Sequence, residues 1–248
     1  MTQLTTKKRF ALVLCSALLL SLGWLGFSGI SLLVALIPLL IISEHYTDSA
    51  GDWWRMAGWG ALTFVLWHAA TVWWVWNATP IGPIAAALFG TFWNLVALMA
   101  YHYVSKRAPR ALAYTLLAAL WITTESLYNS LLLGNGFSND IWAVQWYEYT
   151  GVFGGSLWVL ASNIAIFEIL RTKTKTAKVR AALITLLPML ASIIIFFAYT
   201  PSERTTMVSV IQPNIPCYDE EREAAGKTNA TQDIQRLMAE VSDDAAFV

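Results

Sequence analysis

The stretch TTMVSVIQPNIPCYDEEREAAGK, residues 205–227, decides the interpretation of this chain. It opens with MVSVI at 207–211, a short apolar run that favours a β-strand. The two prolines of QPNIP, at 212–216, then favour an extended turn. Most of the chain before this point is apolar. The stretch therefore predicts the first strand of a water-soluble domain that follows a membrane region.

An amphipathic helix is predicted after this strand, within the polar residues 220–244. Its apolar face has the spacing i, i+3, i+4 and i+7, at Ile234, Leu237, Met238 and Val241. The last residues, DDAAFV at 243–248, have the pattern of a second strand that is only begun. This order is the opening of an α/β sandwich, so we expect residues 201–248 to be its N-terminal fragment.

The composition places most of the chain in a bilayer. It is 57% hydrophobic and 13% charged, and it contains 13 Trp, far more than a soluble protein of this size usually carries. A formal net charge of zero gives no sign of nucleic-acid binding. The two cysteines, Cys15 and Cys217, form neither a disulfide framework nor a zinc-type spacing, so we expect no metal site and no cofactor.

Residues 1–200 contain about seven candidate transmembrane helices, which predicts an α-helical polytopic membrane bundle. The apolar runs are 10–27, 29–43, 56–76, 81–104, 111–133, 150–170 and 181–199. Five of them reach the ~20 residues that a helix needs to cross the hydrocarbon. The first two are short and are separated only by GFSG, which leaves a hairpin of two spans, a re-entrant pair or one long broken helix.

Basic residues gather in every second connection. Lys and Arg before the first, third, fifth and seventh runs make up twelve of the sixteen in the chain, whereas the alternate connections contain none. By the positive-inside rule, the N-terminus lies in the cytoplasm and residues 201–248 lie outside. One long first helix would expel the Lys-rich loops, so we reject it. The basic then apolar start also has the order of a signal peptide, but more membrane segments follow, which favours an uncleaved span.

Few polar residues lie within the apolar runs. Glu125, in LWITTESLYN, falls in mid-span, where a carboxylate is costly unless it is paired, protonated or next to a wet cavity. A functional role is therefore weighed against a structural hydrogen bond to another helix. Asn94 and Asn163 are the candidate partners for that bond. His68 and His102 are lone histidines that favour helix contacts over ligand binding.

Tryptophans mark both predicted interfaces. One group near the inner interface and one near the outer interface consist of Trp53, Trp54 and Trp59, and of Trp73, Trp74 and Trp76. The two groups are typical of an aromatic belt. The outer group also fits the frame of a lipid entrance.

Three motifs follow one another along the chain. ALWITTESLYN contains Trp121 and Glu125, and QPNIP begins at Gln212. Between them, QWYEYTGVFGGSLWVLASNI contains Gly151, Gly154, Ser156 and Asn163. Their order after an odd number of spans resembles the apolipoprotein N-acyltransferase family, whose membrane bundle carries a nitrilase-like domain on its outer face. Phe153 stands where that family has Tyr.

The resemblance implies transfer of a fatty acyl chain from a membrane phospholipid to the N-terminal diacylglyceryl-cysteine of lipoproteins, in the bacterial inner membrane. The family uses a Glu to activate a Cys thiol, a Lys to stabilise the oxyanion and the Cys to carry the acyl group. No residue of this chain matches any of the three, so we assign no catalytic residue and expect residues 1–248 to be inactive alone. Cys217 follows the predicted strand directly and has no cationic neighbour in sequence to activate it.

The candidate lipid-binding or bundle-polar residues are Glu125, Trp121, Asn163, Ser156, Trp146 and Gln212. The expected partners are a phospholipid acyl donor, a diacylglyceryl lipoprotein acceptor and the lipid bilayer. Two alternatives stay open. One is a non-enzymatic polytopic membrane protein, either a transporter or a scaffold. The other is a membrane-anchored amidase of the nitrilase superfamily that acts on another substrate.

Overall fold

Every predicted apolar run forms helix in the computed structural model of the chain, which describes residues 4–128, 131–200, 206–212, 226 and 230–239. The longer helices are α1 (Thr6–Leu22), α3 (Ala50–Val72), α4 (Gly82–Ser105), α5 (Arg110–Tyr128), α6 (Tyr147–Thr172) and α7 (Lys175–Ala198). The shorter ones are α2 (Ile37–Glu44) and the 3₁₀ segments η1 (Gly29–Val34), η2 (Trp73–Asn77), η3 (Leu133–Phe137) and η4 (Ile141–Ala143).

Three helices of the described residues, α4, α6 and α7, are long and apolar enough to cross a membrane. This confirms a helical membrane region, but the number is smaller than the seven spans predicted. α1 has 17 residues, and the second apolar run is divided between η1 and an α2 of 8 residues. α3 and α5 are longer than α1, but their Trp, Gly, Thr and charged residues lower the mean hydropathy of these helices.

The chain folds back on itself between α1 and α2. Ser16 Oγ donates a hydrogen bond to the carbonyl of Ala35 over 2.5 Å, and Ser31 Oγ donates to the carbonyl of Leu19 over 2.8 Å. Ser16 precedes Leu19 in α1, whereas its partner Ala35 follows Ser31 in the other segment. The two segments therefore run antiparallel. Gly26 has a φ of 84° in the turn, a conformation that glycine adopts without strain. This geometry excludes one long first helix.

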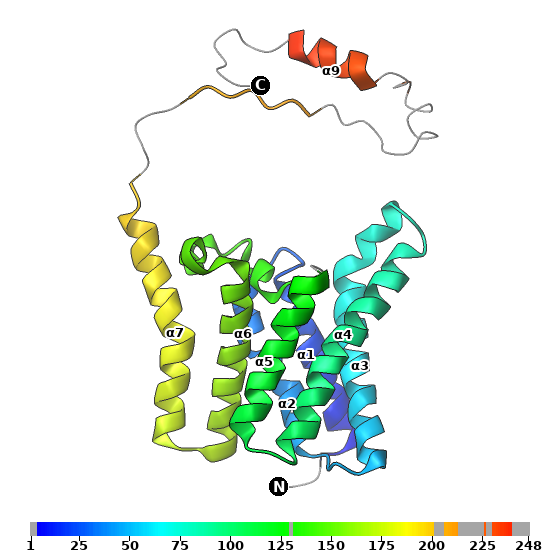
Figure 1. Ribbon diagram of the computed structural model, residues 1–248, viewed down its shortest axis with the longest axis vertical. Helices are drawn as coiled ribbons and strands as arrows, with labels where there is room; N and C mark the ends of the chain where they lie inside the picture. The colour runs from blue at the N-terminus through cyan, green and yellow to red at the C-terminus, as the bar shows by residue number, and fades with distance from the viewer. Residues whose placement is uncertain (1–3, 129–130, 201–205, 213–225, 227–229, 240–248) are drawn as a thin grey trace. The chain divides into compact units, whose positions relative to one another are not determined.

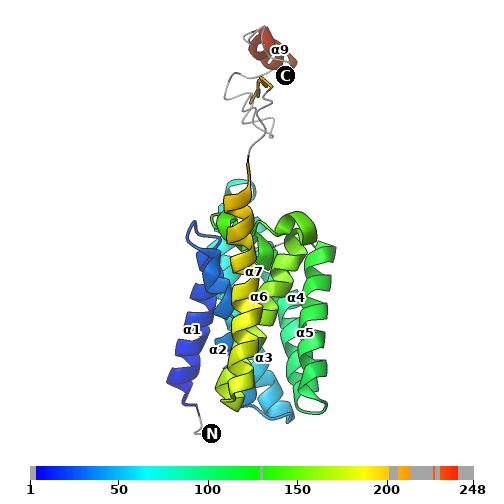
Figure 2. The same ribbon diagram turned by 90° about the vertical axis from the view of Figure 1, so that its left-hand side faces the viewer.

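The bundle has two chemically different ends (Figures 1 and 2). The start of α1 and the connections α2–α3, α4–α5 and α6–α7 lie at one end, called here the basic end. These four places hold twelve of the sixteen Lys and Arg residues. The α1–η1 turn, η2 and the segment with η3 and η4 lie at the other end, called here the loop end. Connections with and without basic residues alternate along the sequence because the chain passes from one end of the bundle to the other with each helical segment.

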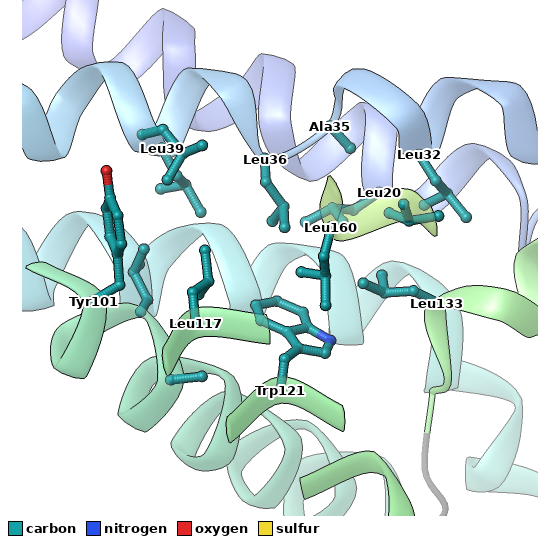
Figure 3. Packing of buried hydrophobic residues seen from close by; sticks show 14 of the residues in the cluster. Leu20, Leu32, Ala35, Leu36, Leu39, Tyr101, Leu117, Trp121, Leu133 and Leu160 are labelled. Atoms are coloured by element: carbon teal, nitrogen blue, oxygen red, sulfur yellow. The ribbon is translucent and has the colours of Figure 1, made fainter. Parts of the chain in front are cut away.

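Trp121 of α5 lies at the centre of the core. Figure 3 shows its ring among Leu117, Leu133 and Leu160, which come from α5, η3 and α6. The side chain is 1% exposed, and the ring of Phe64 meets it edge-on with 5.8 Å between centroids. Removing a buried Trp side chain typically destabilises a protein by about 3–5 kcal/mol, so Trp121 has a clear structural role.

A proline shapes the contact between α6 and α7. Pro188 has no N–H, so the carbonyl of Ile184, four residues earlier in α7, loses its helical partner. Trp158 of α6 donates its Nε1–H to this carbonyl over 3.0 Å. About two turns further along α7, Ser192 Oγ accepts the backbone N–H of Gln145 over 2.5 Å. Two polar contacts thus attach α7 to the rest of the bundle.

The chain divides into two compact units, residues 1–198 and 199–248. In the second unit, α9 (Ala230–Ala239) lies within the predicted amphipathic helix.

The strand predicted at 207–211 does not form as a strand. Residues 206–212 contain only an isolated bridge, at Val208. A strand becomes stable when neighbours pair with it in a sheet, and the described residues supply no such sheet. The predicted second strand at 243–248, most of the predicted turn and Cys217 lie outside the described residues.

Candidate functional site: a buried polar network at the loop end

The segment between α5 and α6 enters the bundle. Leu133 is 0% exposed, and Gly134, Gly136 and Phe137 are buried with it. Glycine permits this close approach, because a Cβ on Gly134 would lie 2.1 Å from the carbonyl oxygen of Val152. Irregular backbone away from water needs partners for its N–H and C=O groups. Side chains from α5 and α6 supply them.

Glu125 of α5 supplies the first partner. Its Oε1 accepts the backbone N–H of Leu133 over 2.8 Å and the Nε1–H of Trp121 over 3.0 Å. Glu125 is 4% exposed, and its Oε2 has no hydrogen-bond partner within the described residues. The backbone partner of Glu125 is thus an N–H of the segment that follows α5, and the expected bond to Asn94 or Asn163 is not the one formed.

Ser156 and Tyr147 of α6 hold the next residue of the segment. Ser156 Oγ accepts the N–H of Gly134, and the Tyr147 hydroxyl donates to the Gly134 carbonyl, each over 3.0 Å. The first turn of α6 is offset from the rest at Gly151, which has φ 66° and ψ −177°, a conformation that strains other residues. A Cβ on Gly155 would lie 1.8 Å from the Tyr147 hydroxyl. The small residues of this motif therefore make room for Tyr147.

Asp140 joins the same segment to the turn between α1 and η1. Its Oδ2 accepts the N–H of Gly29 over 2.6 Å and the hydroxyl of Ser28 over 2.9 Å. Next to it, the Asn139 amide donates to the carbonyl of Phe27 over 3.3 Å. Asp140 is 7% exposed. This residue was not among the predicted site residues, because an acidic side chain in a loop gives no sign in the sequence that it is buried.

A cavity of about 660 Å³ opens between these joined segments. Its walls combine aromatic and aliphatic side chains with small amides, among them Trp24, Phe137, Asn139, Ile141 and Tyr147. Mostly apolar walls with a few fixed polar groups are typical of ligand sites. Gly134 also lines the cavity, so the hydrogen bonds that hold it also fix the cavity wall.

Asn163 of α6 holds the break between η1 and α2. Its Nδ2 donates to the carbonyls of Leu32 and Val159 over 2.7 and 2.8 Å, and its Oδ1 accepts the N–H of Leu36 over 2.7 Å. Both ends of the amide are therefore used. Asn163 makes the interhelical hydrogen bonds expected of it, but its partners are backbone groups at a helix break.

Two predicted site residues lie outside this hydrogen-bonded network. Trp146 packs edge-on against Tyr147 and Trp158, with 4.9 and 5.7 Å between ring centroids, and its Nε1 donates to Ala143 over 3.3 Å. Gln212 belongs to the second unit, where it is exposed. The other four lie in the bundle, three of them around η3 and one at the η1–α2 break.

A second hollow, of about 510 Å³, lies between α3 and α4 at the loop end. Its lining is almost entirely apolar and includes Val65, Trp73, Trp76, Ile84 and Leu88. Trp73 and Trp76 are 61% and 58% exposed, as expected for side chains that meet lipid or its interface.

The histidines take part in helix contacts. His102 bonds through Nδ1 to the Ser43 hydroxyl over 2.8 Å and through Nε2 to the carbonyl of Thr47 over 3.2 Å. His68 Nδ1 lies 2.7 Å from the carbonyl of Phe64 in its own helix, and its ring lies against Gly90 of α4, where a Cβ would be 2.1 Å from Nε2. Within the described ranges, no group of three or more His, Cys, Asp or Glu could hold a metal ion. The side chains of the network act on backbone groups, so their evident chemistry is positioning.

Comparison with known proteins gives two matches. The family described as the apolipoprotein N-acyltransferase N-terminal domain matches residues 16–165, from α1 into α6. The apolipoprotein N-acyltransferase of Chlorobaculum tepidum is 29% identical over 226 residues, which cover 84% of this chain and 42% of that protein. This chain therefore spans less than half the length of that relative. No solved structure matches. Because this match covers more than half of the chain, from within α1 to within α6, the chain belongs to the apolipoprotein N-acyltransferase N-terminal domain family.

Proposed function

We propose that this chain is the membrane part of an enzyme that transfers a fatty acyl chain from a phospholipid to the N-terminal diacylglyceryl-cysteine of lipoproteins. The observation that carries the proposal is the family match over residues 16–165. The name of the Chlorobaculum tepidum relative describes an N-acyltransferase of apolipoproteins. Apolar helices suit an enzyme whose donor and acceptor are both held in a bilayer.

The bundle lies in the bacterial inner membrane in this proposal, with its two ends on opposite faces. The basic end faces the cytoplasm, and the loop end and residues 201–248 face the periplasm. The gathering of the basic connections at one end of the bundle supports this orientation. α1 and the η1–α2 segment cross as a hairpin, in which the buried break is stabilised by Asn163 and Ser16.

Residues 201–248 begin a nitrilase-like domain in this proposal, on the resemblance of QPNIP at 212–216. Gln212 would then belong to that domain. The Glu, Lys and Cys of the reaction have no counterparts within residues 1–248. The 248-residue chain alone therefore collects lipid but transfers no acyl group.

The loop end handles lipid in this proposal. The hollow between α3 and α4 receives an acyl chain, which suits its apolar lining and its exposed Trp73 and Trp76. The cavity beside η3 receives the more polar part of a substrate, near Asn139 and Tyr147. Glu125 and Ser156 act as positioning residues, because their contacts hold the wall of that cavity.

Acyl transfer in proteoliposomes tests the proposal. The liposomes contain phospholipid and a diacylglyceryl lipopeptide, and mass spectrometry follows the lipopeptide. The chain fused to the remainder of the Chlorobaculum tepidum relative should acylate the lipopeptide, as the intact relative does, whereas the 248-residue chain alone should not. Transfer by the 248-residue chain would contradict the proposal that catalysis depends on residues beyond the part shared with this chain. A correctly inserted fusion that transfers nothing would contradict the function itself.

Labelling of single cysteines tests the orientation. In a variant without Cys15 and Cys217, Gln212→Cys should react with a membrane-impermeant maleimide in cells with a permeable outer membrane. Lys173→Cys should react only after the inner membrane is opened. Reaction of both positions from the same side would overturn this orientation.

A further inference from the structure

A groove between α6 and α7 at the basic end is not used by the proposed function. Its volume is about 320 Å³. The part near the α6–α7 connection is lined by hydroxyl and guanidinium groups, from Thr172, Thr174, Thr176 and Arg180. The part further into the bundle is lined by small and aliphatic side chains, from Ala161, Ile164, Ala165, Ala177 and Ile184. The groove is therefore polar at its mouth and apolar along its length.

The mouth of this groove lies in the most basic stretch of the chain. Five of the ten residues 171–180 are basic, namely Arg171, Lys173, Lys175, Lys178 and Arg180. Four of these, all but Arg171, are exposed and have no ion pair within the described residues. Positive charge thus remains available at the mouth.

The acidic groups nearby are already neutralised. Glu168 lines the groove, but Arg171 donates to both of its oxygens, over 2.8 and 2.9 Å, and the Tyr114 hydroxyl also donates to it. Glu44 of α2 forms a two-point ion pair with Arg110. Neither carboxylate therefore cancels the four free cations, and an anion at the mouth would meet net positive charge.

We propose that this groove binds an anionic phospholipid. The phosphate lies at the mouth, where Arg180 and the threonine hydroxyls donate hydrogen bonds to it, and one acyl chain follows the apolar wall between α6 and α7. A soluble phosphate would satisfy only the mouth and would leave the apolar wall uncovered. The wall is therefore the reason that the occupant is a lipid.

The exposure of α7 gives this lipid a structural effect. Ala181 and Ser192 are the buried residues of α7, so much of the helix surface stays open. A lipid between α6 and α7 would bury more of both helices. Binding to the folded state alone raises the melting temperature, so the bound lipid should stabilise the bundle.

Native mass spectrometry and thermal unfolding of the 248-residue chain in mixed micelles test the proposal. Micelles doped with dioleoylphosphatidylglycerol should give a retained lipid and a higher melting temperature than micelles doped with dioleoylphosphatidylcholine. The expected preference is roughly tenfold in affinity, because a few basic groups contribute at the mouth. Equal retention of the two lipids overturns the proposal, and this comparison needs no variant.

Two variants separate a built site from diffuse attraction. Lys175→Gln with Arg180→Gln removes one charge that lines the mouth and one between two threonines that line it, and should reduce the preference about tenfold. Its matched control, Lys7→Gln with Lys8→Gln, removes two exposed charges at the same end and should change little. If both double variants lost the lipid preference equally, the preference would come from the overall positive charge of the basic end, and the proposed site would be overturned.

The apolar wall has its own test, with the charges intact. Ala177→Phe fills the groove from α7 and should abolish the preference, whereas Val179→Phe, on the same helix but outside the groove, should keep it. An undiminished preference in Ala177→Phe would overturn the assigned place of the acyl chain. Displacement of the lipid by soluble glycerol phosphate at similar concentration would show a free-phosphate site and overturn the lipid as occupant.

Discussion

The basic end and the irregular segments of the bundle are stabilised by different kinds of contact. At the basic end, charged side chains pair with one another, as Arg110 does with Glu44. In the irregular segments, Glu125, Asp140 and Asn163 bond mainly to backbone N–H and C=O groups. Regular helices satisfy their own backbone, whereas 3₁₀ segments and helix breaks leave groups that a side chain must satisfy.

This difference has an energetic consequence. A buried backbone group that loses its partner typically destabilises the fold by about 1–3 kcal/mol, whereas an exposed ion pair contributes about 0–1 kcal/mol. Polar substitutions in the irregular segments should therefore have larger effects than charge substitutions at the basic end. The predictions below test that order, beginning with the largest effect.

Asn163→Ala should have the largest effect. It removes the partner of the Leu36 N–H and one of the two donors to the Leu32 carbonyl, which also accepts the N–H of Ala35, at a buried helix break. We expect a loss of about 2–4 kcal/mol in the free energy of unfolding, measured with denaturant in detergent micelles. Asn77→Ala, at an exposed position in η2, is the matched control and should change it by less than about 0.5 kcal/mol. Similar values for the two variants would contradict the role of Asn163 at the break.

Glu125→Leu should have the next largest effect. It leaves the N–H of Leu133 and the Nε1–H of Trp121 without an acceptor, at a loss of about 2–3 kcal/mol. Glu125→Gln keeps an acceptor oxygen and should lose less than about 1 kcal/mol. Hydrogen exchange of residues 133–137 measures the local effect and should rise in Glu125→Leu alone. A Gln variant as unstable as the Leu variant would show that charge, rather than an acceptor oxygen, is needed.

The helices of the bundle could be predicted because their signals are local. Hydrophobic runs and the alternation of basic connections located all seven helical segments and grouped their ends correctly. The number of helices that reach a full span was overestimated. The second run is apolar throughout, and its break between η1 and α2 depends on Asn163, which lies far away in sequence.

The polar network could be predicted only in part for the same reason. Glu125 stands out in an apolar run, but its partner is the backbone of a loop, and backbone groups carry no residue-specific signal. Asp140 lies in a loop, where an acidic residue is ordinary, so its burial against Gly29 could not be read from the sequence. The Ile184 carbonyl is different. Pro188 lies four residues later and has no N–H, so the sequence predicts that this carbonyl lacks its helical partner, but nothing in the sequence identifies Trp158 as the donor.

Trp158→Phe should have an intermediate effect and tests whether the rule for irregular backbone extends to a proline in a helix. It removes the donor to the Ile184 carbonyl, and we expect a loss of about 1–2 kcal/mol in the free energy of unfolding. In the background of Pro188→Ala, an N–H is restored to the helix, so the same substitution should lose about 1 kcal/mol less. Equal losses in the two backgrounds would mean that Trp158 acts through packing rather than through its Nε1–H.

The smallest effects are expected for ion pairs at the basic end, where two pairs differ in exposure. A double-mutant cycle with Glu44→Gln and Arg110→Gln should give a coupling energy of about 1–2 kcal/mol. The reason is that the Arg110 and Glu44 side chains are only 26% and 15% exposed and form two hydrogen bonds with each other. The cycle with Asp48→Asn and Arg107→Gln should give at most about 0.5 kcal/mol, because these side chains are 49% and 39% exposed. In 1 M salt the second coupling should vanish and the first should largely persist. Equal coupling energies for the two ion pairs would show that burial does not determine the strength of these contacts. The larger effects predicted for the buried polar groups of the irregular segments would then have no physical reason.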